Sequence, residues 1–168
     1  MLSDEAIIEN FFVYSVLYSK YLGPAAGGLI CDIGSGYGFP GIPLSICFPG
    51  LRLEIIESSL KKTVFLKELI YRLKLKNCLV INQRLEDVAA AGGFNLKYDS
   101  AVSRAFTGLE DNFDNILKII KLGGVFAALR PKKSINDRDD AGMLRDKKIS
   151  EIKHYKLTEN LFYTVIKK

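Results

Sequence analysis

The stretch "DIGSGYGFPG" (residues 32–41) places four glycines in ten residues, directly after the apolar run at 28–31. An apolar run that passes into a glycine-rich turn predicts a buried strand followed by a tight loop. Glycine has no Cβ, so its backbone can lie close to a ligand or adopt a left-handed turn. We therefore interpret these residues as a ligand-binding loop at the carboxyl end of a strand.

Strand-like and helix-like segments alternate along the rest of the chain. We expect strands at 28–34, 52–57, 78–84, 99–106, 123–130, 151–157 and 161–168. Helical patterns occur at 3–22, 42–48, 61–76, 109–121 and 138–148. This alternation predicts the α/β class, with a Rossmann-like, mostly parallel seven-stranded sheet and helices on both faces. Ligands bind such sheets at the carboxyl ends of the strands, where the glycine loop begins.

The predicted helix at 61–76 carries apolar side chains at helical spacing. Those that we expect to pack on the sheet are Phe65, Leu66, Leu69, Ile70 and Leu73. An apolar stripe of this kind is typical of a helix that covers a sheet.

Composition favours one globular domain that spans residues 1–168. Hydrophobic residues make up 48% of the chain and charged residues 26%, which is enough apolar material for a core. The apolar stretch at 11–18 is too short and too polar to cross a membrane. Asp4 and Glu5 stand where a signal peptide would carry Lys or Arg. We therefore expect a cytoplasmic protein with no membrane partner.

The cysteines and the histidine argue against a metal centre. Cys31, Cys47 and Cys78 lie far apart in apolar surroundings, so we expect buried free thiols. His154 is the only histidine, and it lies in a polar segment. We therefore expect neither a histidine-based metal site nor a Ser-His-Asp triad.

Three chemistries are compatible with a glycine-rich loop at a strand end. A phosphate-binding P-loop needs Lys-Ser/Thr after its last glycine, but Ile42 and Pro43 stand there. A dinucleotide loop matches the spacing of residues 36–41, although Asp32 would then face two phosphates. The series Asp32, Gly34, Gly36 and Gly38 suits a ligand that carries an ammonium group and no phosphate. S-adenosylmethionine is such a ligand.

Glu57 ends the second predicted strand, and a carboxylate there can accept hydrogen bonds from the two hydroxyls of a ribose. Both NAD and S-adenosylmethionine contain this ribose. Glu57 therefore supports the fold and leaves the choice of cofactor open.

Positive charge favours an anionic partner. The net charge is +5, with six cations and one acid between residues 61 and 76. A second cluster, Arg130, Lys132 and Lys133, follows the fifth predicted strand. Because this second cluster lies at the carboxyl edge, we expect it to bind the phosphates of such a partner. Lys74 and Lys76 should approach the opposite edge.

Four segments resemble one known family. "CDIGSGYGFPGIPLSI", "IESSLKKTVFLKEL", "QRLED" and "YDSAVSRAF" follow in order, as in the ribosomal small subunit methyltransferase G family, also called glucose-inhibited division protein B. The resemblance covers about residues 5 to 168. It implies a class I methyltransferase that uses S-adenosyl-L-methionine to methylate N7 of one guanosine in 16S rRNA.

The resemblance also implies site residues. The cofactor contacts that it implies are Gly34, Phe39, Leu85, Glu86 and Arg104. The residues themselves add Asp32, Gly36, Gly38 and Glu57. Arg104 ends the fourth predicted strand, where cofactor and target base would meet, and is our candidate catalytic residue.

The resemblance further implies an organisation and partners. Residues 1–24 correspond to a remnant of the family's N-terminal helical region, and residues 25–168 to the Rossmann-like core. The family's His-x-x-Asp-Ser reads Phe11-Phe12-Val13-Tyr14-Ser15 here, and a family lysine is Arg130. We expect a monomer that acts on 16S rRNA or the 30S particle. The alternatives are a cofactor-binding or RNA-binding module with impaired catalysis, and an NAD-dependent oxidoreductase.

Overall fold

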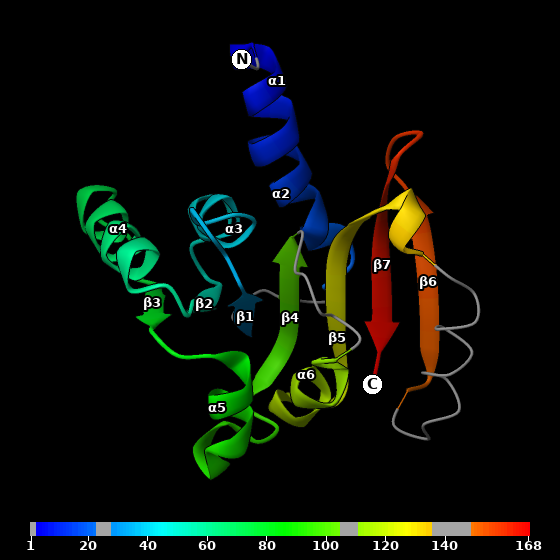
Figure 1. Ribbon diagram of the computed structural model, residues 1–168. Helices are drawn as coiled ribbons and strands as arrows, with labels where there is room; N and C mark the ends of the chain where they lie inside the picture. The colour runs from blue at the N-terminus through cyan, green and yellow to red at the C-terminus, as the bar shows by residue number, and fades with distance from the viewer. Residues whose placement is uncertain (1–2, 23–27, 105–110, 136–148) are drawn as a thin grey trace.

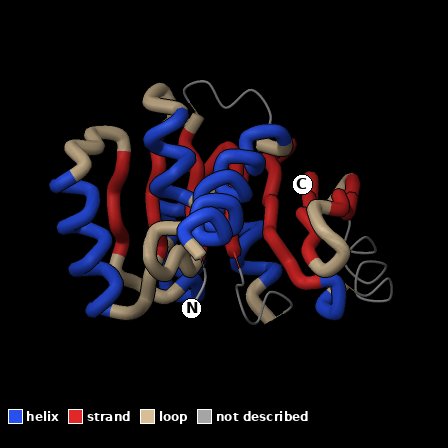
Figure 2. The backbone as a smooth tube through the Cα atoms, turned by 90° about the horizontal axis from the view of Figure 1, so that it is seen from above, coloured by secondary structure: helices blue, strands red, loops and turns tan. Residues whose placement is uncertain are grey.

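The computed structural model describes residues 3–22, 28–104, 111–135 and 149–168, and its centre is one seven-stranded sheet. The strands are β1 (Leu29–Ile33), β2 (Arg52–Ile56), β3 (Cys78–Ile81), β4 (Tyr98–Arg104), β5 (Ile120–Pro131), β6 (Glu151–Lys156) and β7 (Leu161–Lys167). They lie side by side in the order β3-β2-β1-β4-β5-β7-β6 (Figures 1 and 2).

Strand direction confirms the predicted mostly parallel sheet. β1 pairs in parallel with β2 and β4, β2 with β3, and β4 with β5. β7 alone among the paired strands runs antiparallel to both of its neighbours, β5 and β6. The chain moves outward from β1 to β3 and then returns to the other side of β1. This reversal creates a switch point between β1 and β4, where such folds bind ligands.

Helices cover both faces of the sheet, also as predicted. The helical elements are α1 (Asp4–Ile7), the π-helical η1 (Ile8–Val13), α2 (Tyr14–Leu17), the 3₁₀ turn η2 (Tyr18–Lys20), α3 (Gly41–Cys47), α4 (Leu60–Arg72), α5 (Leu85–Ala90), η3 (Gly92–Phe94), α6 (Phe113–Ile119) and η4 (Lys132–Ser134). One apolar core joins the sheet to α2, α3 and α4, and a second joins its other face to α5 and α6 (Figure 1).

The N-terminal helical segment is fixed to the sheet by buried hydroxyl groups. It begins where the sequence predicts, because Ser3 Oγ accepts a hydrogen bond from the Ala6 N–H at 3.2 Å. The fully buried Tyr18 hydroxyl donates to the Ser103 carbonyl at 2.5 Å and accepts from the Leu129 N–H at 2.8 Å. This one side chain therefore ties the segment to β4 and β5, and Figure 1 shows α2 beside the upper end of β4.

Helix α4 differs from its prediction. It ends at Arg72 rather than residue 76, since Lys74 has a left-handed φ of 53° that ends the helix. Leu66 is buried as expected, and Leu69 and Ile70 pack at its margin. The prediction was wrong for Phe65 and Leu73, which are exposed. Phe65 lies a third of a turn away from Leu66 and so leaves the sheet.

Other departures are smaller. β5 begins at Ile120 rather than residue 123. Its pairing with β4 shifts register between Tyr98 and Ser100, and this shift accommodates Gly123 and Gly124 within β5. Cys31 is buried, but Cys47 is exposed, so the prediction of buried thiols fails there. The helix predicted at 138–148 lies outside the described residues.

Replacing Tyr18 by Phe should lower the free energy of unfolding by about 1–3 kcal/mol, the usual cost of leaving buried backbone groups without a partner. Chemical denaturation monitored by circular dichroism measures this change. Tyr71→Phe is the matched control, because the Tyr71 side chain is exposed on α4. Equal stability of the two variants would contradict the anchoring role of Tyr18.

Candidate functional site

The glycine loop turns sharply at the end of β1. Gly34, Gly36 and Gly38 have φ values of 65°, 62° and 100°, in the region that favours glycine. A Cβ on Gly38 would lie 2.7 Å from Cγ1 of Ile42, in the first turn of α3. The Gly34 N–H donates to the Ile56 carbonyl at 2.9 Å and so continues the pairing of β1 with β2. The glycines are therefore required by the loop's own backbone.

Asp32 lies beneath this loop rather than in the open. Its carboxylate is fully buried, and Oδ2 accepts hydrogen bonds from the Ser35 hydroxyl at 2.6 Å and the Gly41 N–H at 2.8 Å. A Cβ on Gly41 would lie 2.6 Å from the same oxygen, so glycine is needed there. Asp32 therefore fixes the conformation of the loop, and any effect that it has on a ligand is through the loop.

Asp32 also carries the most distinctive electrostatics of the loop. Oδ1 is buried without a hydrogen-bond partner among the described residues. Burial raises the pKa of Asp32 from 3.8 to about 7, against the opposing effect of the hydrogen bonds from Ser35 and Gly41. The negative charge of Glu57 adds to the rise.

Glu57 holds the loop from the other side. Its buried carboxylate accepts hydrogen bonds from the Gly36 N–H at 3.0 Å and the Ser59 N–H at 2.9 Å. It therefore joins the loop to the residue that caps α4. Each carboxylate oxygen has two lone pairs, so each retains the capacity to accept a further hydroxyl.

A cavity of about 260 Å³ lies at the carboxyl ends of β1, β2 and β3. Its lining residues are Ile33, Gly34, Ile56, Ser58, Gln83, Arg84, Leu85, Glu86 and Asn112. Gly34, Leu85 and Glu86, which the sequence singled out, come together here. Asp32 and Glu57 do not line it.

Sequence reasoning missed four polar residues of this cavity. Ser58 follows the end of β2, Gln83 and Arg84 follow the end of β3, and Asn112 precedes α6. The rule that ligands bind at the carboxyl ends of parallel strands would have identified the first three.

Phe39 and Arg104 meet on the N-terminal helical segment instead. The Phe39 ring contacts Phe11 and Phe12 edge to face, with centroids 5.2 and 5.3 Å apart. The Arg104 guanidinium lies 4.2 Å from the Phe11 centroid and donates to the Asn10 carbonyl at 2.5 Å. Burial lowers the pKa of Arg104, which nevertheless stays charged. These contacts fix Arg104 at the carboxyl end of β4.

The basic cluster after β5 is divided. Lys132 and Lys133 are exposed in η4. Arg130 is buried, and its guanidinium donates to the Ser134 carbonyl. Arg130 therefore stabilises the turn that presents the two lysines, and the sequence did not reveal this.

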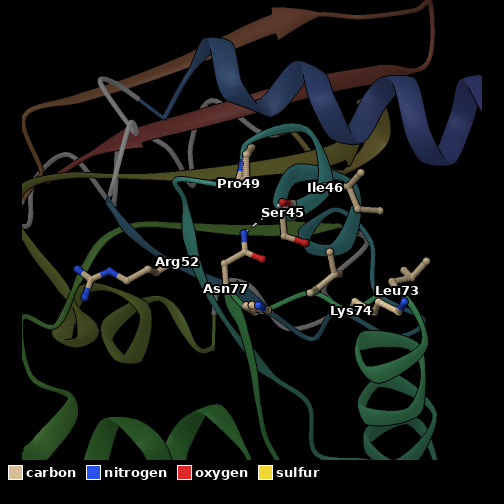
Figure 3. A pocket seen from close by; sticks show the side chains of 9 residues that line it. Ser45, Ile46, Pro49, Arg52, Leu73, Lys74 and Asn77 are labelled. Carbon is tan, nitrogen blue, oxygen red and sulfur yellow. Dashed lines mark hydrogen bonds between the residues drawn. The ribbon is translucent and has the colours of Figure 1, made fainter.

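A larger cavity, of about 630 Å³, lies at the opposite edge of the sheet (Figure 3). Asn77 fixes its wall by donating to the Ser45 carbonyl at 3.1 Å and the Leu51 carbonyl at 2.9 Å. Lys74 and Lys76 line it, so they lie at the amino ends of the strands, away from the glycine loop.

The described residues offer no metal centre: no group of three or more His, Cys, Asp or Glu side chains there is arranged to hold an ion. Within the same residues, no helix has the length and apolar character needed to cross a membrane.

Comparison with known families now decides the relationship. A sequence model described as rRNA small subunit methyltransferase G matches residues 3–162. The chain belongs to the rRNA small subunit methyltransferase G family.

Two curated proteins illustrate the methyltransferase G relationship. The ribosomal RNA small subunit methyltransferase G of Acetivibrio thermocellus is 37% identical over 127 residues, 76% of this chain and 52% of that protein. That of Polynucleobacter asymbioticus is 38% identical over 137 residues, 82% of this chain and 60% of that protein. The chain thus spans between half and three fifths of the length of these relatives.

Solved structures agree with the fold of this chain. A SAM dependent methyltransferase from Aquifex aeolicus has a TM-score of 0.72 and 17% identity, covering 98% of this chain and 93% of that one. TYW2 of M. jannaschii, solved in complex with AdoMet, has a TM-score of 0.68 and 18% identity, covering 99% and 76%. The class I methyltransferase fold is therefore confirmed.

Asp32→Asn should change how the stability of the chain depends on pH. Since the folded chain holds the Asp32 proton up to about pH 7 and the unfolded chain releases it near 3.8, wild-type stability falls as pH rises through this window. The asparagine does not titrate. Urea denaturation at a series of pH values should show the wild-type advantage over the variant declining from about pH 4 to about pH 7. A difference that stays constant or grows would contradict the raised pKa.

Proposed function

We propose that this chain is an S-adenosylmethionine-dependent methyltransferase that methylates N7 of a guanosine in 16S rRNA. One observation carries the proposal: Gly34, Leu85 and Glu86 line one cavity at the carboxyl edge, in a chain that the methyltransferase G model matches over residues 3–162. The name of that family supplies the small-subunit rRNA as the substrate.

The cavity fits part of the cofactor. At about 260 Å³ it is a little smaller than the 300 Å³ or so at which ligand pockets begin, so it suits one moiety, the nucleoside. Ile33, Ile56 and Leu85 give it apolar walls, and Glu86 and Asn112 are polar groups in its lining. In this proposal Gly34 borders the methionine moiety. The TYW2 structure in complex with AdoMet supports the same cofactor on the same fold.

In this proposal Glu57 contacts the ribose of the nucleoside directly, whereas Gly36 and Gly38 act through the shape that they give the loop. The carboxylate oxygens of Glu57 each accept one N–H and can accept a ribose hydroxyl as well. When bound, S-adenosylmethionine supplies an electrophilic methyl group on its sulfonium. Asp32 and Phe39 shape the loop on which that group would lie.

Methylation of guanine N7 requires no general acid or base from the protein. This nitrogen carries an in-plane lone pair and no proton, so no side chain has to remove one. The chain's contribution is then to hold the reacting atoms in line, an effect worth up to about 7–11 kcal/mol. Arg104 donates one hydrogen bond to Asn10 and has further N–H groups with which to hold the target base.

RNA docking in this proposal uses the exposed part of the basic cluster. Lys132 and Lys133 lie after β5, at the same edge as the glycine loop, and bind phosphates there. Arg130 supports them through the η4 turn. We further propose that residues 1–168 act as one domain and a monomer, with residues 25–168 as the core. The substrate is 16S rRNA or the 30S particle in the cytoplasm.

Direct transfer tests the function. The chain is incubated with naked 16S rRNA or with 30S particles and methyl-labelled S-adenosylmethionine, and N7-methylguanosine is mapped by chemical cleavage. We expect label at one guanosine. Cofactor binding without transfer would favour the impaired binding module, and protection by NADH in place of S-adenosylmethionine would favour the oxidoreductase.

Gly34→Val should abolish cofactor binding. A β-branched residue is strained at a φ of 65°, and Gly34 lines the cavity, so the loop should lose its ligand-binding shape there. Calorimetry with S-adenosylmethionine or its demethylated product should detect binding to the wild type and none to a folded variant. Gly92→Val is the control, since Gly92 has open space around the position of a Cβ. Unchanged binding by the Gly34 variant would remove the loop from the mechanism.

Arg104→Ala should lower the single-turnover rate about ten-fold or more, because it removes a charged hydrogen-bond donor. The protein should remain folded. Arg104→Lys should restore only part of the rate, since lysine lacks the planar fork of donors. A wild-type rate in the alanine variant would refute a role for Arg104 in the site.

A further inference from the structure

An exposed aromatic pair stands beside the glycine loop. Tyr37 lies in the loop itself and is 63% exposed, and Phe65 lies on α4 and is 44% exposed. Their rings meet edge to face, with centroids 5.5 Å apart and planes at 83°. The two rings thus form one small aromatic surface, which we call the Tyr37–Phe65 platform.

The platform is not a misplaced part of the core. Leu66, the next residue after Phe65, fills the core position of this helical turn and is fully buried. Tyr37 occupies the central place of Gly36-Tyr37-Gly38, where the flanking glycines leave its ring in solvent. Neither ring fills a gap in the apolar core that joins α4 to the sheet.

Positive charge accompanies the platform. Lys61 and Lys62 lie four and three residues before Phe65, on its face of the helix, and Lys61 is exposed and Lys62 half-buried. The first acid of the helix, Glu68, is paired with Arg72 at 2.6 Å. The amino-terminal half of α4 therefore presents cations to whatever contacts the rings.

The platform is continuous with the cofactor site. Tyr37 belongs to the loop that Asp32 and Glu57 hold, and Ser58, which lines the 260 Å³ cavity, directly precedes the cap of α4. A ligand that touches both rings therefore contacts the same loop that borders the 260 Å³ cavity through Gly34.

We propose that the Tyr37–Phe65 platform stacks an unpaired base of the RNA substrate close to the target guanosine. Aromatic rings bind single-stranded RNA by stacking on its bases, and neighbouring lysines attract its phosphates. This inference rests on the proposed function, because it takes RNA as the substrate. It adds a base-stacking surface on a different element from Lys132 and Lys133.

The test compares paired variants. Tyr37→Ala with Phe65→Ala removes both rings, and Tyr37→Phe with Phe65→Tyr keeps two rings at the same places. Tyr71→Ala is the matched control, since Tyr71 is 79% exposed at the far end of the same helix. Fluorescence anisotropy measures binding to a labelled 16S rRNA fragment that contains the target guanosine, unpaired or closed in a duplex, over a range of salt concentrations. Calorimetry measures affinity for S-adenosylmethionine.

Loss of both rings should weaken binding of the unpaired fragment about ten-fold and leave its salt slope unchanged, because stacking involves no phosphate. Affinity for the duplex and for S-adenosylmethionine should not change. The two-ring variant and the Tyr71 control should bind like the wild type. Lys132→Ala with Lys133→Ala should instead lower the salt slope by about one to two units.

Wild-type affinity of the double alanine variant for the unpaired fragment would overturn the platform. So would an equal loss on duplex RNA. If the double alanine variant bound the RNA fragment normally but bound whole 30S particles more weakly, the platform would also be overturned. The two rings would then contact a ribosomal protein rather than RNA. A wild type that binds the fragment through the rings but transfers no methyl group supports the platform and contradicts the proposed function.

Discussion

The buried carboxylate of Asp32 is the interaction on which the site depends. It accepts hydrogen bonds from Ser35 and Gly41, so that a single oxygen fixes both the turn after β1 and the first residue of α3. Glu57 does the same from β2, through Gly36 and Ser59. Two acids thus hold a loop whose glycines leave no side chain to hold it. Burying them has an electrostatic cost, seen in the raised pKa of Asp32.

The second constraint is the N-terminal helical segment. Tyr18 anchors it to β4 and β5, and its Phe11 ring then packs against Phe39 of the loop and the Arg104 guanidinium. Arg104 would otherwise be a long, freely rotating side chain at a strand end. Packing against an aromatic face and a hydrogen bond to Asn10 restrict it. The N-terminal helical segment therefore orders Arg104 at the carboxyl end of β4.

The sequence predicted the sheet, the faces of most helices and the position of the loop, because these follow from local apolar periodicity and from glycine. The family resemblance implied Gly34, Leu85 and Glu86 as cofactor contacts, and these three residues line one cavity. The sequence did not predict that Arg130 is buried or that Phe65 leaves the core for Tyr37. Phe65 depends on a ring in the glycine loop, which is distant in the chain, and Arg130 depends on the backbone of the η4 turn that follows it. Apolar periodicity encodes neither contact.

The chemistry and the architecture explain each other. In the proposed reaction a methyl group is transferred to a nitrogen lone pair and no proton has to be removed, so the acids of the site can hold the backbone rather than act in catalysis. Asp32 and Glu57 are buried against N–H groups, a poor place for a general base and a good one for a rigid support. The residues exposed at the same edge include two aromatic side chains, Tyr37 and Phe65, and the lysines of η4. Those side chains can bind and orient a nucleic acid without reacting with it, which is what alignment of the methyl group and the target nitrogen requires.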